Sequence, residues 1–170
     1  LPELGEAIAA HYAGHYGVRV SPERVMVTAG STAALLLVMA LLVDRDERIL
    51  LADPGYPCNR TFVRLLEGEA AGIPVGPDTR YQLTADLVER HWTPRTRGVL
   101  VATPSNPTGT TIPHDEMGKI AAVVGHRGGH LLLPVPDPDP VLLDGDACGA
   151  QRRHAAAPVP VAPGPGGLEQ

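Results

Sequence analysis

The sequence predicts an α/β fold in which helices cover both faces of a mostly parallel sheet. Short apolar runs alternate with segments of helical period, the pattern of parallel strands joined by helices. The run VLVA at residues 99–102 is continuously apolar, as in a strand buried on both faces. Two prolines, an asparagine and a glycine follow within residues 103–109 and end that strand in a turn. Because ligands of open α/β sheets bind outside the carboxyl ends of the strands, this turn is a candidate site.

The first half of the chain alternates predicted helices with predicted strands. Leu4, Ile8, Tyr12 and Tyr16 repeat at the helical period, and Gly17 is suited to stop that helix. A later helix is apolar nearly all round, which predicts that it is buried. The predicted elements are, in order, a helix at 1–16, a strand at 25–28, the apolar helix at 33–43, a strand at 49–52, a helix at 59–66 and a strand at 70–75.

Two more helices and two more strands are predicted in the second half. Thr84 is a suitable N-cap for a helix at 84–92, with Asp86 in its first turn. After the strand at 99–102, a helix at 113–124 carries acidic residues in its first turn. The last predicted strand is 130–133.

A change in composition separates residues 1–133, the predicted folded domain, from residues 134–170. The second segment holds eight of the chain's eighteen prolines and shows neither the helical nor the strand period. Prolines at alternate positions forbid both a helix and a central strand. Two interpretations stay open: a disordered, polyproline-like tail, or out-of-frame translation of a GC-rich gene.

Composition excludes several classes of partner. The net charge is -5 with no basic cluster, which argues against binding to nucleic acid or to an anionic membrane. The longest apolar run has 11 residues, against about 20 for a membrane span. Cys58 and Cys148 form no disulfide or metal pattern, and no metal-ligand spacing occurs, so we expect no metal and a cytoplasmic location. Since the chain begins at Leu1 and not at methionine, we expect a fragment.

Three turns carry residues suited to binding. In AGSTAA, at residues 29–34, Gly30 and Ser31 precede a helix and suit a phosphate, but small residues before a helix are common and an ordinary N-cap is the simpler explanation. In DPGYPCN, at residues 53–59, Tyr56 stands between two prolines and could stack on a planar heterocycle or simply cover the core. In PSNPTG, at residues 104–109, Asn106 could hydrogen-bond a ligand oxygen or could simply be an asparagine suited to the turn.

Together, AGSTAAL, DPGYP and SNPTG resemble, in order and separation, the large domain of class I/II aminotransferases, which are fold-type-I enzymes dependent on pyridoxal 5′-phosphate. The resemblance runs from about Leu1 to Gly129. It implies that Gly30 and Ser31 bind the cofactor phosphate, that Tyr56 stacks on the pyridine ring, and that Asn106 donates to the phenolic oxygen. It also implies a cis peptide bond before Pro54 or Pro107.

The family's remaining functional residues have no counterpart here. They are the Schiff-base lysine, an aspartate that pairs with the pyridinium nitrogen, and an arginine that binds the substrate carboxylate. Lys119, the only lysine, falls on a predicted surface helix, so no catalytic residue is assigned. The resemblance implies an enzyme, a homodimer when complete, that moves an amino group between an amino acid and a 2-oxo acid. We expect this chain by itself to be inactive; the alternative is a non-catalytic phosphate-binding or interaction module.

Overall fold

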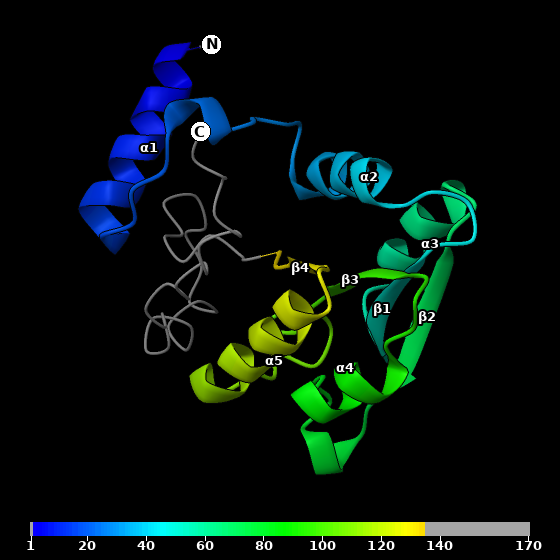
Figure 1. The fold of residues 1–170 in the computed structure, drawn as a ribbon. Helices are drawn as coiled ribbons and strands as arrows, with labels where there is room; N and C mark the ends of the chain where they lie inside the picture. Colours follow the sequence, from blue (N-terminus) through cyan, green and yellow to red (C-terminus); the bar gives the residue numbers. More distant parts are fainter. Residues whose placement is uncertain (1, 135–170) are drawn as a thin grey trace, which may run out of the picture. The chain divides into compact units, whose positions relative to one another are not determined.

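The structure, a computed structural model, describes residues 2–134. These residues fall into two compact units, 2–26 and 27–134, each of which is considered by itself (Figure 1). Apart from Pro134, the predicted tail lies outside the described residues. The division of the chain into a domain at 1–133 and a tail at 134–170 therefore stays a prediction.

The first unit consists of helix α1 (Pro2–Tyr16) and the 3-10 helix η1 (Pro22–Arg24). Gly17 has φ 67° and stops α1 as predicted. The apolar face expected of α1 is not buried, because Leu4 and Tyr12 are 42% and 45% exposed. Only Gly5 and Ala9 of this helix are buried, so its small side chains and not its large ones make the packed face.

The second unit is a parallel sheet with helices on both faces, which confirms the predicted fold class. Its strands are hydrogen-bonded in the order β2-β1-β3-β4, and all three pairings are parallel. The elements are α2 (Ser31–Leu42), β1 (Arg48–Asp53), α3 (Pro57–Leu65), β2 (Glu69–Pro74), η2 (Pro77–Thr79), α4 (Ala85–His91), β3 (Thr96–Leu100), α5 (His114–His126) and β4 (His130–Leu132).

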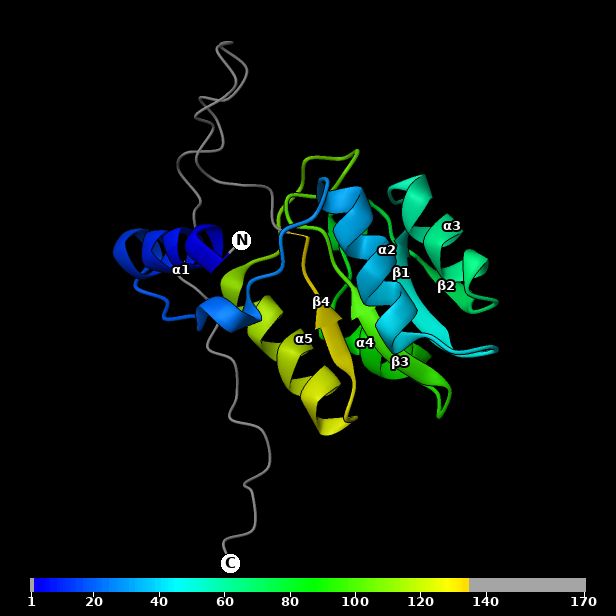
Figure 2. The ribbon, with the colours of Figure 1, turned by 90° about the horizontal axis from the view of Figure 1, so that it is seen from above.

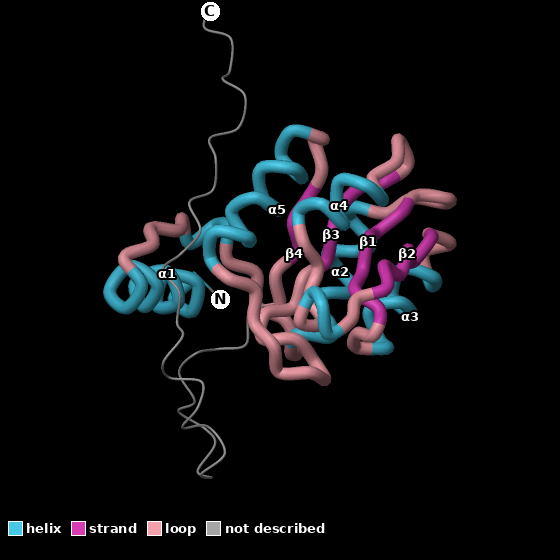
Figure 3. The backbone as a smooth tube through the Cα atoms, turned by 90° about the horizontal axis from the view of Figure 1, so that it is seen from below, coloured by secondary structure: helices cyan, strands magenta, loops and turns pink. Residues whose placement is uncertain are grey.

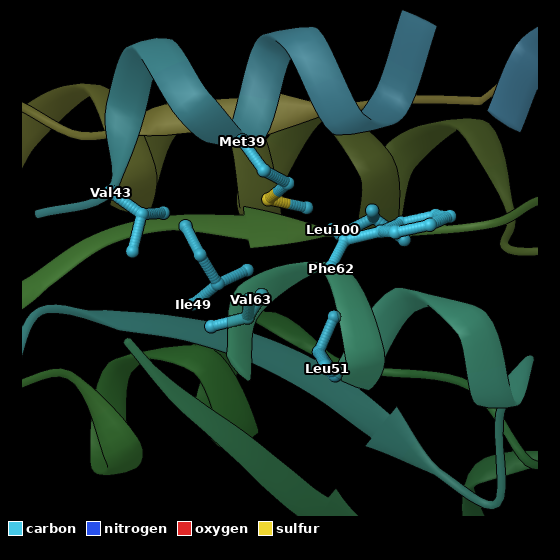
Figure 4. Close-up of a cluster of buried hydrophobic side chains, with 7 residues drawn as sticks. All are labelled: Met39, Val43, Ile49, Leu51, Phe62, Val63 and Leu100. Atoms are coloured by element: carbon cyan, nitrogen blue, oxygen red, sulfur yellow. The ribbon is translucent and has the colours of Figure 1, made fainter. Parts of the chain in front are cut away.

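Helices α2 and α3 cover one face of the sheet, and α4 and α5 cover the other (Figures 1 and 2). In Figure 3 the second pair lies toward the viewer, with the strands in magenta behind it. The first pair packs on a cluster of buried side chains from both helices, from the residue that follows α2, and from strands β1 and β3 (Figure 4): Met39, Val43, Ile49, Leu51, Phe62, Val63 and Leu100. Leu50 and Val99 alternate with these positions along their strands and are fully buried on the opposite face.

The predicted strand at residues 25–28 is wrong. Val25 closes the turn of η1 by donating its N–H to the carbonyl of Pro22. Met26 and Val27 are 76% and 57% exposed. An extended segment becomes a strand only when a neighbour pairs with its backbone, and the described sheet offers 25–28 no such neighbour.

The expected burial of the apolar helix is also only partly correct. Met39 is the one buried residue of α2, whereas Leu37 and Leu41 are 48% and 80% exposed. A helix on one face of a sheet buries the side that faces the strands. The sequence of α2 is apolar on its outer side as well, and that side is uncovered in the described part of the chain.

Glu47 links the start of β1 to β3 and gives stability a predictable dependence on pH. Its carboxylate binds the Arg97 guanidinium and the Asp44 N–H, and these two contacts hold the pKa of Glu47 below its usual range. A lowered folded-state pKa contributes stability above the unfolded pKa of about 4.3, and that contribution is lost as pH falls through the folded-state pKa.

We therefore expect Glu47→Gln to destabilise the protein at neutral pH and to reduce its further loss of stability on titration to about pH 3. Urea unfolding at several pH values measures this. The matched control is Glu67→Gln, since Glu67 pairs with Arg45 through side chains that are 63% and 72% exposed. If both variants keep the wild-type pH profile, Glu47 does not supply the acid-sensitive contribution.

Candidate functional site

Two loops meet where strands β1 and β3 end. The first, residues 54–56, leads from β1 into α3, and the second, residues 101–113, leads from β3 into α5. Because β1 and β3 are parallel neighbours, both loops leave the same edge of the sheet. The chain runs from β1 outward to β2 and then back past β1 to β3, so the strand order reverses between β1 and β3. Ligands of open α/β sheets bind at such a point.

A pocket lies at this point and contains two of the predicted site residues. Tyr56 comes from the first loop and Asn106 from the second, so the structure brings together residues fifty positions apart. The lining consists of Leu51, Ala52, Gly55, Tyr56, Asn59, Arg60, Gln82, Leu83, Leu100, Val101, Ala102, Ser105 and Asn106.

Tyr56 is held at the start of α3 by its neighbours. It is the N-cap residue, with φ -61° and ψ 120°, and Pro57 occupies the first helical position. Asp53, at the end of β1, pairs with Arg60 of α3 at 2.6 Å and ties the strand to the helix across this turn. The side chain of Tyr56 is 39% exposed, and a hydrogen bond with Cys58 raises its pKa. The ring is therefore fixed at its base and accessible at the pocket.

Asn106 lies in a loop that is closed by its own backbone. The Ser105 N–H donates to the Thr110 carbonyl at 2.9 Å, and the Gly109 N–H donates to the Ser105 carbonyl at 2.8 Å. Gly109 has φ 69°, a value that favours glycine. Where the loop ends, the Ile112 N–H donates to Oγ1 of Thr103 at 3.0 Å.

The predicted cis peptide bonds are present before both Pro54 and Pro107. The structure adds a third, before Pro104. All three lie in the two loops that border the pocket.

Gly30 and Ser31 lie elsewhere, at the N-terminus of α2, and neither lines the pocket. Gly30 has φ 88°, as the N-cap position of this turn requires. Its N–H is already used in a hydrogen bond to the Thr28 carbonyl at 2.8 Å. The backbone N–H groups of the first helical turn are the donors that remain for an anion there. Phosphate binding by these residues stays a prediction.

The pocket also contains residues that the sequence analysis missed. Gln82 is 5% exposed and Asn59 is 8% exposed, and both are polar. Within residues 2–134, Oδ1 of Asn59 has no hydrogen-bond partner. Asn59 follows Tyr56 by three residues, so helical spacing would have placed the two near each other. Gln82 reaches the site only through the tertiary fold, and nothing in its local sequence marks it.

Lys119 lies on α5 and outside the pocket lining. Its Nζ is 3.1 Å from Glu116 and 3.7 Å from Asp115, and its side chain is 61% exposed. The hydrogen bond to Glu116, together with the charges of Glu116 and Asp115, raises the pKa of Lys119. The predicted surface position is confirmed. Glu116 also accepts from the Ala85 N–H at 2.8 Å, which joins the starts of α4 and α5.

Within residues 2–134, no three histidine, cysteine, aspartate or glutamate side chains gather where they could hold a metal ion. No helix in the same range is long and apolar enough to cross a membrane.

Known proteins resemble this chain over most of its described part. The family described as aminotransferase class I and II matches residues 1–133. A valine–pyruvate aminotransferase of Mycobacterium tuberculosis is 44% identical over 122 residues, which are 72% of this chain and 31% of that protein. A probable aspartate/prephenate aminotransferase of Aquifex aeolicus is 30% identical over 128 residues, or 75% of this chain and 32% of that protein.

Solved structures give the same result for the fold. The crystal structure of an aminotransferase from Mycobacterium tuberculosis superposes with a TM-score of 0.73 at 41% identity, over 78% of this chain and 34% of that one. Aspartate aminotransferase from Thermus thermophilus with maleate has a TM-score of 0.74 at 27% identity, over 78% and 35% of the two chains. The chain spans about a third of the length of the curated relatives it matches, 31% for the first of them.

Proposed function

Because this chain belongs to the class I and II aminotransferase family, we propose that its pocket between β1 and β3 forms part of a pyridoxal 5′-phosphate site. In the complete enzyme, this site would serve the transfer of an amino group between an amino acid and a 2-oxo acid. One observation carries the proposal: Tyr56 and Asn106, assigned to the cofactor ring from two separate motifs, line one pocket.

The residues of the pocket fit a planar, polar heterocycle. The accessible ring of Tyr56 offers a stacking surface, and the amide of Asn106 offers a donor for the phenolic oxygen. Leu51, Leu83 and Leu100 supply an apolar lining, which lowers the local dielectric and strengthens such a hydrogen bond. For the phosphate we propose the turn at Gly30 and Ser31. The Gly30 N–H is bonded to the Thr28 carbonyl, so the donors there would be the backbone N–H groups of the first turn of α2, at the positive end of the helix dipole.

These residues bind and orient, and they do not react. When bound, pyridoxal phosphate supplies an electron sink for carbanionic chemistry. Asn106, as a donor, would stabilise the phenolate form of the ring, and Tyr56 would fix the plane of the ring. The amine that covalent chemistry requires is not in the pocket, since Lys119 lies on α5. We therefore assign binding to this chain and leave the reacting groups to the rest of a complete enzyme, which we propose to be a homodimer.

The position of Lys119 also favours a second candidate function. A chain that binds the cofactor but places no amine beside it would be a non-catalytic phosphate-binding or interaction module on the same scaffold. Ligand preference separates the possibilities: an aminotransferase segment should bind pyridoxal phosphate through Tyr56 and Asn106, whereas a module for other phosphates should bind inorganic phosphate equally well.

We expect the purified chain to bind pyridoxal phosphate weakly and reversibly, as followed by absorbance and by equilibrium dialysis. Removing the donor in Asn106→Ala or the ring in Tyr56→Ala should each weaken binding about 2- to 12-fold, the equivalent of one hydrogen bond or one aromatic contact. Tyr12→Ala is the matched control, because Tyr12 is a similarly exposed tyrosine on α1.

Asn106→Asp keeps the shape of the side chain and removes its donor, so it should weaken binding at least as much as Asn106→Ala. Thermal unfolding of each variant checks that the fold is retained. Unchanged affinity in both Tyr56→Ala and Asn106→Ala would remove the pocket from the cofactor site.

A further inference from the structure

Gln82 connects the two arms of the loop that carries Asn106. Its Nε2 donates to the Thr110 carbonyl at 2.5 Å and lies 3.4 Å from the Ala102 carbonyl and 3.3 Å from Oγ1 of Thr110. Ala102 precedes the loop, and Thr110 is in its returning arm. We propose that Gln82 is a positioning residue that holds Asn106 at the cofactor ring, an inference that rests on the function proposed above.

Gln82 links two carbonyl groups that the arms cannot link by themselves. Ala102 and Thr110 both present carbonyl oxygens, which accept hydrogen bonds and cannot bond to each other. A primary amide nitrogen carries two N–H donors and can serve both carbonyls at once. Two hydrogen bonds of the loop's own also join its arms: Ser105 to Thr110 nearer the tip, and Ile112 to Thr103 at the base. Gln82 adds a link from outside the loop that ties the Ala102 and Thr110 carbonyls to one side chain. Asn106 lies inside the segment that these contacts close.

The backbone of the segment before Gln82 is fixed by its conformation and by hydrogen bonds. Arg80 and Tyr81 have φ 56° and 57°, left-handed values that residues other than glycine seldom adopt. The Gln82 N–H donates to the Thr79 carbonyl at 3.1 Å, and the Tyr81 N–H donates to the Gly76 carbonyl at 2.7 Å. Leu83 is 1% exposed and anchors the following position in the core. Disfavoured backbone that the surrounding contacts maintain is concentrated at functional sites.

The burial of Gln82 indicates that its hydrogen bonds matter. Gln82 is 5% exposed, and a polar side chain is costly at such a site unless its groups are hydrogen-bonded. An apolar side chain of the same size would fill the space but would not join the two arms. Gln82 also lines the pocket together with Asn106, so its bonds act at the site. If they are lost, Asn106 should occupy its binding position for a smaller fraction of the time, and affinity should fall by that fraction.

The test is a double-mutant cycle between Gln82→Met and Asn106→Ala, with pyridoxal phosphate as the titrated ligand. Methionine keeps the length of the side chain and removes both donors. We expect Gln82→Met to weaken binding about 2- to 12-fold when Asn106 is present. In the Asn106→Ala background the same substitution should have no further effect. If the double variant loses affinity by the product of the two single-variant losses, the proposal is overturned. Such a result would show that Gln82 acts on stability or on the ligand directly.

Thr79→Val is the matched control for this cycle. Among residues 2–134, Oγ1 of Thr79 bonds only to Gly76 within the same turn, so its loss perturbs the segment without touching the loop. We expect the effect of Thr79→Val to be the same with and without Asn106. Coupling of Thr79→Val to Asn106→Ala as strong as that of Gln82→Met would overturn a specific role for Gln82.

A second readout needs no ligand. Hydrogen exchange of the ligand-free chain should become faster within residues 103–112 in Gln82→Met and stay unchanged in the core strands. Faster exchange confined to that loop supports the positioning role even if the chain proves not to bind pyridoxal phosphate, in which case the proposed function alone fails. Unchanged exchange in 103–112 overturns the positioning role whatever the binding result.

Discussion

Ile49→Ala is expected to lower the free energy of unfolding by about 2–5 kcal/mol. Ile49 is fully buried on β1, in the cluster where α2 and α3 pack on the sheet. Its replacement removes apolar burial and leaves a cavity between elements from three parts of the chain. Small domains have net stabilities of about 5–15 kcal/mol, so this single change removes a large share of the total. Urea unfolding followed by circular dichroism measures it.

Leu41→Ala is the control for that experiment. Leu41 lies on α2, as part of the same helix–sheet layer, but is 80% exposed. Its replacement should change the free energy of unfolding by no more than about 0.5 kcal/mol. A loss in Leu41→Ala as large as that in Ile49→Ala would mean that the outer side of α2 is buried in solution, for example by a second copy of the chain.

The second large effect is chemical: we expect this chain to catalyse no amino-group transfer, even when it is saturated with pyridoxal phosphate. Covalent catalysis needs an uncharged amine beside the cofactor. Lys119 is the only lysine, and Glu116 and Asp115 raise its pKa and so favour its charged form. It is also outside the pocket. Borohydride reduction of the chain with pyridoxal phosphate, followed by mass spectrometry, should therefore show no stoichiometric adduct on Lys119.

Lys119→Arg keeps the positive charge and removes the primary amine. We expect it to bind pyridoxal phosphate with the affinity of the unsubstituted chain, because the proposed contacts lie at Tyr56 and Asn106. Stoichiometric labelling of Lys119, accompanied by transfer of an amino group to a 2-oxo acid, would contradict this prediction.

Local sequence signals predicted most of the secondary structure. Thr84 caps α4 as expected, with its Oγ1 accepting from the Leu87 N–H at 3.2 Å. The strand predicted at 70–75 is β2, Glu69–Pro74. The strand predicted at 99–102 is β3, Thr96–Leu100, which starts and ends earlier because pairing with β1 begins at Thr96. Signals within a few residues suffice for such elements, since caps, turns and periodicity act over one or two turns of chain.

The errors concern features that depend on distant parts of the chain. Residues 25–28 have the composition of a strand, yet a strand exists only when another strand pairs with it. The apolar sequence of α2 predicted burial all round, yet only its sheet side is covered in the described structure. In both cases the local sequence was suited to the predicted state, but the described residues supply no partner that completes it.

The sequence by itself determined the α/β class, most of the helices and strands, the turns around Tyr56 and Asn106, and a family resemblance that the comparisons confirm. Only the tertiary structure decided that these two turns share a pocket, because strand order is a non-local property. β1 and β3 are neighbours only because β2 lies on the outer side of β1. The same topology places Gln82, which precedes Asn106 by 24 positions, beside the loop that carries Asn106. The hydrogen-bond partners of Gln82 are the Ala102 and Thr110 carbonyls, which are distant in sequence. Residues next to Gln82 in the sequence therefore do not indicate these partners.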